Sequence, residues 1–134
     1  MWHKATGRVV YDPPRPGMKN KTKGWCVVPV PIEVTRYYRW WVEKERHVYL
    51  KRPSWDAHVS IVRGEALSEG AAKLWKKYHG ARVDYEYAQN PHAGSSKLFW
   101  SVDVRSDFMD TIRSELGLTT GWYYHITIGR LYND

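Results

Sequence analysis

His58-Val59-Ser60-Ile61 and His125-Ile126-Thr127-Ile128 share one pattern: a histidine, an apolar residue, a hydroxyl residue and a second apolar residue. In an extended strand, side chains alternate between the two faces of the sheet. The histidine and the hydroxyl of each tetrapeptide therefore share one face, while the apolar residues take the other. The pattern predicts two half-buried strands that each present an imidazole and a hydroxyl group together.

Hydrophobic periodicity and turn signals predict further elements around these two strands. Strands are expected at about residues 7–11, 25–30, 57–63, 83–88, 98–105 and 123–131, and helices at about 32–46, 68–78 and 106–116. The expected N-caps of the second and third helices are Ser68 and either Ser106 or Asp107. These two helices are expected to end at Gly80 and Gly117. Loops are expected at residues 12–24 and 89–96, and residues 47–50 either extend the preceding helix or begin a short strand.

The order of these elements describes two similar halves, each with strands, a helix and a histidine-bearing strand. In both halves an arginine, Arg63 or Arg130, stands five places after the histidine. We expect a single α+β domain over residues 1–134, with two-lobed, pseudo-symmetric antiparallel sheets and outer helices around a central cleft. If the two strands lie side by side, one cleft holds two imidazoles for proton transfer and two hydroxyls for a phosphoryl oxygen.

Charge and aromatic content favour an anionic partner. Lys and Arg outnumber Asp and Glu by 21 to 14, and the excess lies in residues 1–63, so a nucleotide or RNA partner is expected. A basic surface that merely aids solubility is the alternative. The eight Trp and ten Tyr residues suit base stacking, although aromatic rings also serve as core and rim residues.

Several classes of protein are not indicated. Cys26 is the sole cysteine, which precludes an intramolecular disulfide and is typical of a reducing compartment. No apolar run suggests a membrane span, and the first residues do not resemble a signal peptide, so we expect a cytoplasmic protein, in the host cytoplasm if the source is a virus. The histidine and cysteine spacings predict no metal site, and no glycine-rich nucleotide loop is present, so no cofactor is expected.

The two tetrapeptides resemble the signature of the 2H phosphoesterase superfamily, whose LigT-like members carry two His-x-Thr/Ser-x units on strands lining a two-lobed cleft. The resemblance covers most of the chain in architecture and is specific at the two motifs. The second motif, with Gly129-Arg130 after it, is similar to the family's His-x-Thr-Leu-Ala-Arg form. In the first motif, Ser60 replaces the commoner threonine and keeps the hydroxyl.

The resemblance implies a metal-independent nucleotide phosphodiesterase. His58 and His125 would form the acid–base pair, and Ser60 and Thr127 would bind the phosphate. Family members open 2′,3′-cyclic phosphates at RNA ends, trim 2′-5′ or 3′-5′ linked oligonucleotides, or destroy the cyclic oligonucleotide signals of the CBASS antiviral defence. The expected substrate is therefore a cyclic di- or trinucleotide, a short oligonucleotide signal or a 2′,3′-cyclic phosphate end.

Residues beside the motifs are candidates for substrate binding. Trp55, Tyr123 and Tyr124 immediately precede the motifs and either stack on a base or pack in the core. Arg130 and Arg63 have a parity opposite to that of the histidines in regular strands, so a phosphate contact is expected only beyond the strand end. The other histidines have no matching partner; His92, in its polar loop, either lies at the surface or reaches a cleft.

Two other functions fit the same composition. The first is a non-catalytic, basic and aromatic-rich RNA-binding module in which the histidines are structural, and whose binding depends strongly on salt. The second is an interaction or structural protein such as a virion component, which no specific feature favours. Cleavage of a nucleotide in excess EDTA would distinguish the enzyme from both.

Overall fold

The computed structural model describes residues 1–14 and 22–131, and in this part of the chain it shows an α+β structure of one eight-stranded sheet and three helices. The strands are β1 (Trp2–Arg8), β2 (Val10–Tyr11), β3 (Trp25–Pro29), β4 (His58–Arg63), β5 (Arg82–Ala88), β6 (His92–Ala93), β7 (Phe99–Arg105) and β8 (Tyr124–Arg130). The helices are α1 (Ile32–Arg46), α2 (Glu69–Ala72) and α3 (Asp107–Glu115). None of these helices is long and apolar enough to cross a membrane.

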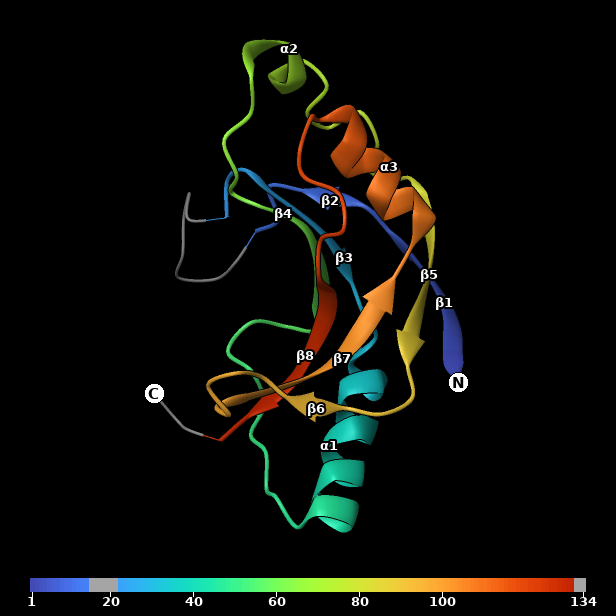
Figure 1. Cartoon of the computed structure of the whole chain (residues 1–134), viewed down its shortest axis with the longest axis vertical. Helices are drawn as coiled ribbons and strands as arrows, with labels where there is room; N and C mark the ends of the chain where they lie inside the picture. The colour runs from blue at the N-terminus through green and yellow to red at the C-terminus, as the bar shows by residue number, and fades with distance from the viewer. Residues whose placement is uncertain (15–21, 132–134) are drawn as a thin grey trace.

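The sheet is antiparallel throughout and runs in the order β1-β5-β7-β8-β4-β3-β2, with β6 paired to β7 (Figure 1). The sequence predicted separate sheets, whereas the strands join into a single one because β8 pairs with both β7 and β4. The sheet curves until β1 approaches β3. A Cβ atom on Gly7 would lie 2.5 Å from Val28 Cγ1, so this close approach requires glycine.

Helices α1 and α3 pack against the sheet. Helix α1 contacts β8, where Arg39 Nη1 donates a hydrogen bond to the carbonyl oxygen of Ile128 at 2.8 Å. The helix begins and ends as predicted, and His47, with φ of 56°, turns the chain out of it. Residues 47–50 form neither helix nor strand. Helix α3 contacts β5 and β4, and its predicted N-cap Ser106 accepts a hydrogen bond from the amide of Met109.

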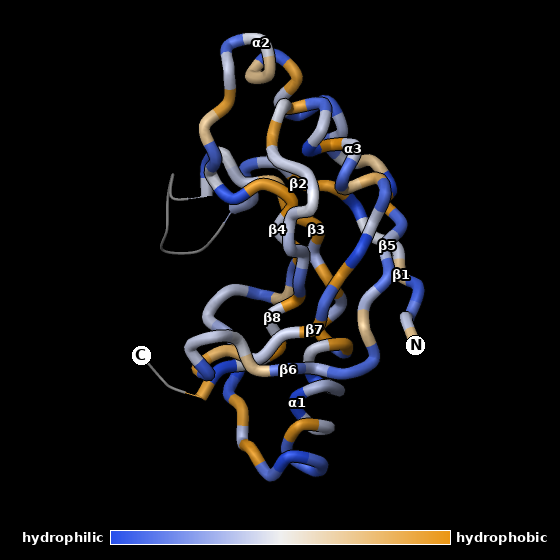
Figure 2. The backbone as a smooth tube through the Cα atoms, viewed as in Figure 1, coloured by the Kyte–Doolittle hydropathy of each residue, from blue (hydrophilic) through white to orange (hydrophobic). Residues whose placement is uncertain are grey.

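The core lies between the sheet and these helices. Figure 2 shows hydrophobic stretches on the strands, β3 and β4 among them. The apolar residues of both tetrapeptides are completely buried, as the alternating pattern predicts. The fully or almost fully buried core includes Val28, Tyr38, Val42, Val59, Ile61, Val102, Met109, Ile112, Ile126 and Ile128. Cys26 also belongs to it, and burial raises the pKa of its thiol to about 12.

Helix α2 is much shorter than the predicted helix at residues 68–78. Ser68 does cap it, accepting a hydrogen bond from the amide of Ala71 at 3.1 Å. Beyond Ala72 the chain continues in turns, and Lys76 has φ of 72°, a left-handed conformation that a helix does not accommodate. The turns bring the Trp75 indole to the Asp12 carboxylate, to which it donates a hydrogen bond at 3.1 Å. This tertiary contact competes with continuation of the helix.

The N-terminal strand and one loop also differ from expectation. The strand expected at residues 7–11 begins at Trp2 and is interrupted at Val9, whose backbone bonds to Ala81 and Gly80 instead of to a neighbouring strand. The loop expected at residues 89–96 contains the short strand β6. Most of the proline- and lysine-rich loop expected at residues 12–24 lies outside the described residues.

Candidate active site

The two tetrapeptides lie on neighbouring strands, β4 and β8. Val59 and Ile126 form the cross-strand pair that joins these strands, and both are completely buried. Because the strands are antiparallel, this register sets the histidine of each motif beside the hydroxyl residue of the other. The four polar side chains emerge on the face opposite the core, as the alternation predicted. The structure thus brings together four residues selected from the sequence: His58, Ser60, His125 and Thr127.

A pocket of about 520 Å³ opens on this face. Its volume lies within the range of small-ligand sites, roughly 300–1,000 Å³. Its walls come from β3, β4, β7 and β8 and from the loops that precede β4, β7 and β8. The lining residues are Trp25, Pro53, Ser54, Trp55, Asp56, His58, Ser60, Arg63, Gly94, Ser95, Ser96, Phe99, Ser101, Tyr123, His125 and Thr127. The predicted substrate-binding residues Trp55 and Tyr123 are among them.

A backbone carbonyl orients the imidazole of His58. Its Nδ1 lies 2.6 Å from the carbonyl oxygen of Asp56, two residues earlier. Because a carbonyl can only accept a hydrogen bond, Nδ1 carries the hydrogen of the neutral ring, and Nε2 is then the basic nitrogen. The indole of Trp55 packs on the imidazole, with ring centroids 4.1 Å apart. The carbonyl and the indole together fix the tautomer and the plane of the ring.

The imidazole of His125 is oriented in the same way as that of His58. Its Nδ1 lies 3.4 Å from the carbonyl oxygen of Tyr123, again two residues earlier. The phenol ring of Tyr123 stacks on the imidazole, with centroids 4.8 Å apart and 15° between the planes. Each imidazole therefore has Nδ1 fixed by the preceding loop and one face covered by an aromatic ring.

The surroundings of His125 favour its neutral form. Burial is the main cause that lowers its pKa from the ordinary value of 6.5, and the positive charges of Arg63 and His92 act in the same direction. The Tyr123 carbonyl and the Asp103 carboxylate oppose these effects. At neutral pH the ring is consequently neutral, which is the form that accepts a proton.

A cluster of hydrogen-bonded side chains adjoins His125 at the rim of the pocket. Asp103 on β7 is the cross-strand partner of His125. Its Oδ1 accepts hydrogen bonds from the Tyr123 hydroxyl at 2.9 Å and from His92 Nε2 at 2.8 Å. The hydrogen bond to Asp103 is the main cause that raises the pKa of His92. The cluster was not predicted, because the sequence contains no signal for the registers that set β6 beside β7 and β7 beside β8.

Arg63 reaches the pocket because β4 is irregular. Cys26 pairs with Val62 but Val27 pairs with Ser60, so Ile61 is an extra residue on β4, as in a β-bulge. The extra residue reverses the alternation beyond it, and Ile61 and Val62 are both buried. Arg63 is thereby turned to the same side as His58. The expectation of opposite parity was wrong here, since it assumed a regular strand.

Aromatic rings line the wall of the pocket on the β3–β4 side. The guanidinium of Arg63 lies over the ring of Trp25, 5.4 Å from its centroid. The Trp25 ring packs against Trp55 at 5.2 Å, and Trp55 in turn packs against His58. A cation and two indoles therefore extend from the imidazole along one side of the pocket.

Serine hydroxyls line the opposite side. Ser101, 7% exposed, is the cross-strand partner of Thr127, and Ser95 and Ser96 belong to the loop that precedes β7. Ser54 also lines the pocket, but it belongs to the loop before β4 and is adjacent in the chain to Trp55. No periodic pattern marks these serines in the sequence, so only the tertiary structure shows that they share the pocket with Thr127.

Two of the predicted substrate-binding residues are not brought into the pocket. Tyr124 is 3% exposed, and its hydroxyl donates a hydrogen bond to Asp110 on α3 at 2.9 Å. It directly precedes His125 in a strand, so its side chain takes the opposite face and enters the core. Arg130 lies at the end of β8, where its backbone pairs with Lys51, and it is not among the residues that line the pocket.

The described residues contain no group of three or more His, Cys, Asp or Glu side chains that could hold a metal ion. Comparison of the chain with protein-family models, with curated proteins and with solved structures finds no match in any of the three. The functional interpretation therefore depends on the geometry and chemistry of the pocket.

Proposed function

We propose that the protein is a nucleotide phosphodiesterase of the 2H type that acts in the cytoplasm, which would be the host cytoplasm for a viral protein. The observation that carries this proposal is the pairing of β4 with β8, which puts two imidazoles and two hydroxyls into one pocket. Each imidazole has its Nδ1 directed to a backbone carbonyl, so the basic nitrogen of the neutral ring is Nε2 in both. Two such groups suffice for both proton transfers of a phosphodiester cleavage.

The proposed reaction is an in-line displacement at phosphorus. One neutral imidazole takes a proton from the attacking oxygen, which belongs to water or to a ribose 2′-hydroxyl. As the new P–O bond forms, the bond to the leaving ribose oxygen breaks, and the other, protonated imidazole gives that oxygen a proton. Side chains supply both proton transfers, so the reaction should proceed in excess EDTA.

We assign the role of base to His125. Burial and the charge of Arg63 lower the pKa of its imidazole, so the ring is neutral at the start of the reaction. His58 is then the acid that protonates the leaving oxygen. The assignment applies to one direction of attack, because a group that serves as acid in one step serves as base in the reverse step.

The remaining polar groups suit a phosphate. Ser60 and Thr127 can donate hydrogen bonds to the non-bridging oxygens, whose charge must be stabilised as the bonds exchange. The guanidinium of Arg63 can pair with the same oxygens. The indoles of Trp25 and Trp55 offer faces for a nucleobase, and a stacked base contributes roughly 1–3 kcal/mol.

The irregularities of β4 and β8 support a pseudo-symmetric, two-lobed arrangement. Ile61 is the extra residue of β4 against β3, and Ile128 is the extra residue of β8 against β7. Each follows its histidine by three positions. We interpret the two strands with their outer neighbours as the inner parts of two lobes that meet between β4 and β8.

The proposed substrates are cyclic di- or trinucleotides and short oligonucleotide signals, as for a viral anti-defence enzyme, or 2′,3′-cyclic phosphate RNA ends. The test is a panel of 2′,3′-cyclic mononucleotides, 2′-5′ oligoadenylate and cyclic dinucleotides incubated with the protein in excess EDTA. Chromatography of the products identifies the substrate and the bond cut. Cyclic trinucleotides are added to the panel if none of these compounds is cleaved. Absence of cleavage of every compound would contradict the proposal.

The alternative is an RNA-binding module without catalysis. Tyr37 and Trp40 on α1 favour it, because they are 55% and 53% exposed and their rings lie 6.0 Å apart on a helix that also carries Arg36. Exposed rings beside cations are typical of single-strand binding. This alternative predicts salt-dependent binding of single-stranded RNA without cleavage, weakened by replacing Tyr37 and Trp40 with serine.

A further inference from the structure

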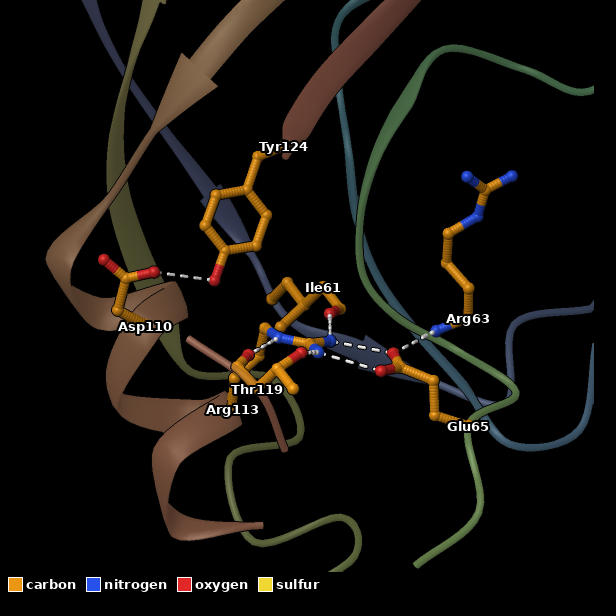
Figure 3. Close-up of polar contacts among 7 residues, drawn as sticks. All are labelled: Ile61, Arg63, Glu65, Asp110, Arg113, Thr119 and Tyr124. Carbon is orange, nitrogen blue, oxygen red and sulfur yellow. Dashed lines mark hydrogen bonds and ion pairs between the residues drawn. The ribbon is translucent and has the colours of Figure 1, made fainter. Parts of the chain in front are cut away.

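Arg113 on α3 is a charged side chain with no exposed surface. Its Nη1 donates hydrogen bonds to the carbonyl oxygen of Ile61 and to Glu65 Oε1, both at 2.8 Å, and its Nη2 donates to Glu65 Oε2 at 2.8 Å (Figure 3). Its Nε donates to the carbonyl oxygen of Thr119 at 2.8 Å, and its Nη2 also donates to the Thr119 hydroxyl at 3.2 Å. The guanidinium also lies over the ring of Trp122 at 4.1 Å. Every donor of this side chain is therefore directed to a neighbouring segment of the chain.

The partners of Arg113 adjoin both motif strands. Ile61 ends the first tetrapeptide and is the extra residue of β4. Thr119 and Trp122 belong to the connection from α3 to β8, directly before the Tyr123 carbonyl that orients His125. Neither Arg113 nor Glu65 lines the pocket itself, so neither can touch a substrate there.

The hydrogen bonds of Glu65 continue to Arg63. Its Oε1 also accepts a hydrogen bond from the backbone amide of Arg63 at 3.4 Å. Gly64, between the two, has φ of 71° and supplies the turn. The segment from Ile61 to Glu65 is thus held at both ends, by the Ile61 carbonyl and by the Glu65 carboxylate. Figure 3 shows the side chain of Arg63 directed away from this network.

The ion pair joins Arg113, which has no exposed surface, to Glu65, whose side chain is 25% exposed, and burying a charge in this way adds little stability to a core. Apolar residues of similar volume often give equal or greater stability, because the charges lose their hydration. What the pair can supply is a defined geometry, since the planar guanidinium fixes two carboxylate oxygens and a carbonyl at once. Here the guanidinium donates to the carbonyl oxygen of Ile61, the extra residue of β4.

We propose that Arg113 is a positioning residue for the pocket: together with Glu65 it holds the irregular end of β4 in the conformation that directs Arg63 to the bound phosphate. This inference rests on the proposed function, because it assigns to Arg63 a phosphate oxygen as its ligand. It adds a residue that acts from behind the sheet and that touches neither substrate nor imidazole. Arg113 acts through Arg63.

The test compares Arg113→Lys and Arg63→Gln, singly and together. The first readout is the pKa of His125 from NMR titration of its imidazole protons, which requires no turnover. Since the charge of Arg63 lowers this pKa, Arg63→Gln should raise it. If Arg113 acts through Arg63, Arg113→Lys should raise it also, and the double variant should not exceed Arg63→Gln alone.

The second readout is the binding of inorganic phosphate. We expect about tenfold weaker binding in each single variant, the loss that follows from removing one charged hydrogen bond, and no further loss in the double variant. If Arg113→Lys does not fold, Glu65→Gln tests the same inference, because it weakens the same ion pair. Arg105→Lys is the matched control, because Arg105 also pairs with a glutamate, Glu86 at 2.9 Å, and lies over a tryptophan ring at 4.1 Å, but away from the pocket.

Two results would overturn the inference. One is a folded Arg113→Lys or Glu65→Gln variant with the wild-type pKa of His125 and wild-type phosphate binding. The other is a double variant in which the two effects add, because additivity would mean that Arg113 does not act through Arg63. A wild-type protein that neither binds phosphate nor cleaves a nucleotide would instead contradict the proposed function, and the His125 titration would still decide the role of Arg113.

Discussion

Tyr123 contacts His125 in two ways, through a ring stack at 4.8 Å and through a backbone carbonyl that accepts from Nδ1. The Tyr123 hydroxyl is in turn bonded to Asp103, the cross-strand partner of His125. One residue thus links the imidazole to the neighbouring strand. His125 is a partly exposed side chain, yet its orientation is set by contacts on two sides.

Substitutions of Tyr123 should distinguish the effect of the ring stack on His125 from the effect of the backbone carbonyl. In Tyr123→Leu the carbonyl remains and the ring is lost, so we expect kcat to fall about three- to tenfold, since an aromatic pair contributes roughly 0.5–1.5 kcal/mol. Tyr123→Phe keeps the ring and should lose less. Steady-state kinetics of both variants measure the difference, and equal losses would show that the hydroxyl, not the stack, holds His125.

The pH dependence of the reaction should reveal the environment of His125. Burial and Arg63 lower its pKa, so the neutral base persists as the pH falls below the ordinary value of 6.5, and activity should be lost only at lower pH. In Arg63→Gln the acidic limb of the kcat/KM profile should move to higher pH. An acidic limb above pH 6.5 in the wild-type protein would contradict the assignment of His125 as base.

The protonation of His92 should make the free energy of unfolding depend on pH. Its pKa is raised in the folded state by Asp103, so its contribution is complete below the unfolded pKa and is lost as the pH rises through the folded pKa. His92→Gln should therefore reduce the free energy of unfolding more at pH 5.5 than at pH 8.5, by less than about 1 kcal/mol because the pair is half exposed. Urea unfolding measures this, and an effect that survives unchanged in an Asp103→Asn background would contradict the pairing.

The close approach of β1 to β3 should make the stability of the fold depend on Gly7. Gly7→Ala would place a methyl group 2.5 Å from Val28 Cγ1, and we expect a loss of roughly 1–3 kcal/mol in the free energy of unfolding, as in other overpacked cores. Gly70→Ala is the matched control, because nothing lies within 4 Å of its Cβ position in α2. That change should be neutral or slightly stabilising. Equal melting temperatures for the two variants would contradict the close approach of β1 to β3.

The features that depend on local alternation and helix capping could be predicted from the sequence. The apolar positions Val59 and Ile126 lie in the core, Ser106 caps α3, and α1 begins and ends where its pattern does. Each of these features depends on neighbours within a few residues. The faces of the two motif strands, and therefore the polar side of the pocket, follow from the sequence for the same reason.

What the sequence did not predict depends on pairing between distant segments. The extra residue Ile61 turns Arg63 into the pocket, and only the register of β3 against β4 reveals it. Asp103 gains its place beside His125 from the register of β7 against β8. The expectation for Tyr124 failed for a different reason, since nearness to His125 in sequence was given more weight than its opposite parity in the strand.

The most direct test of the account is the rate of nucleotide cleavage by His58→Ala and His125→Ala in excess EDTA, with His47→Asn as a control outside the pocket. Asparagine suits the left-handed backbone of residue 47, so the control should keep both fold and activity. We predict that each alanine variant remains folded and loses cleavage by at least about a hundredfold, as expected for removal of a general acid or base. Wild-type rates in either folded alanine variant would contradict the claim that both imidazoles act on one phosphorus atom.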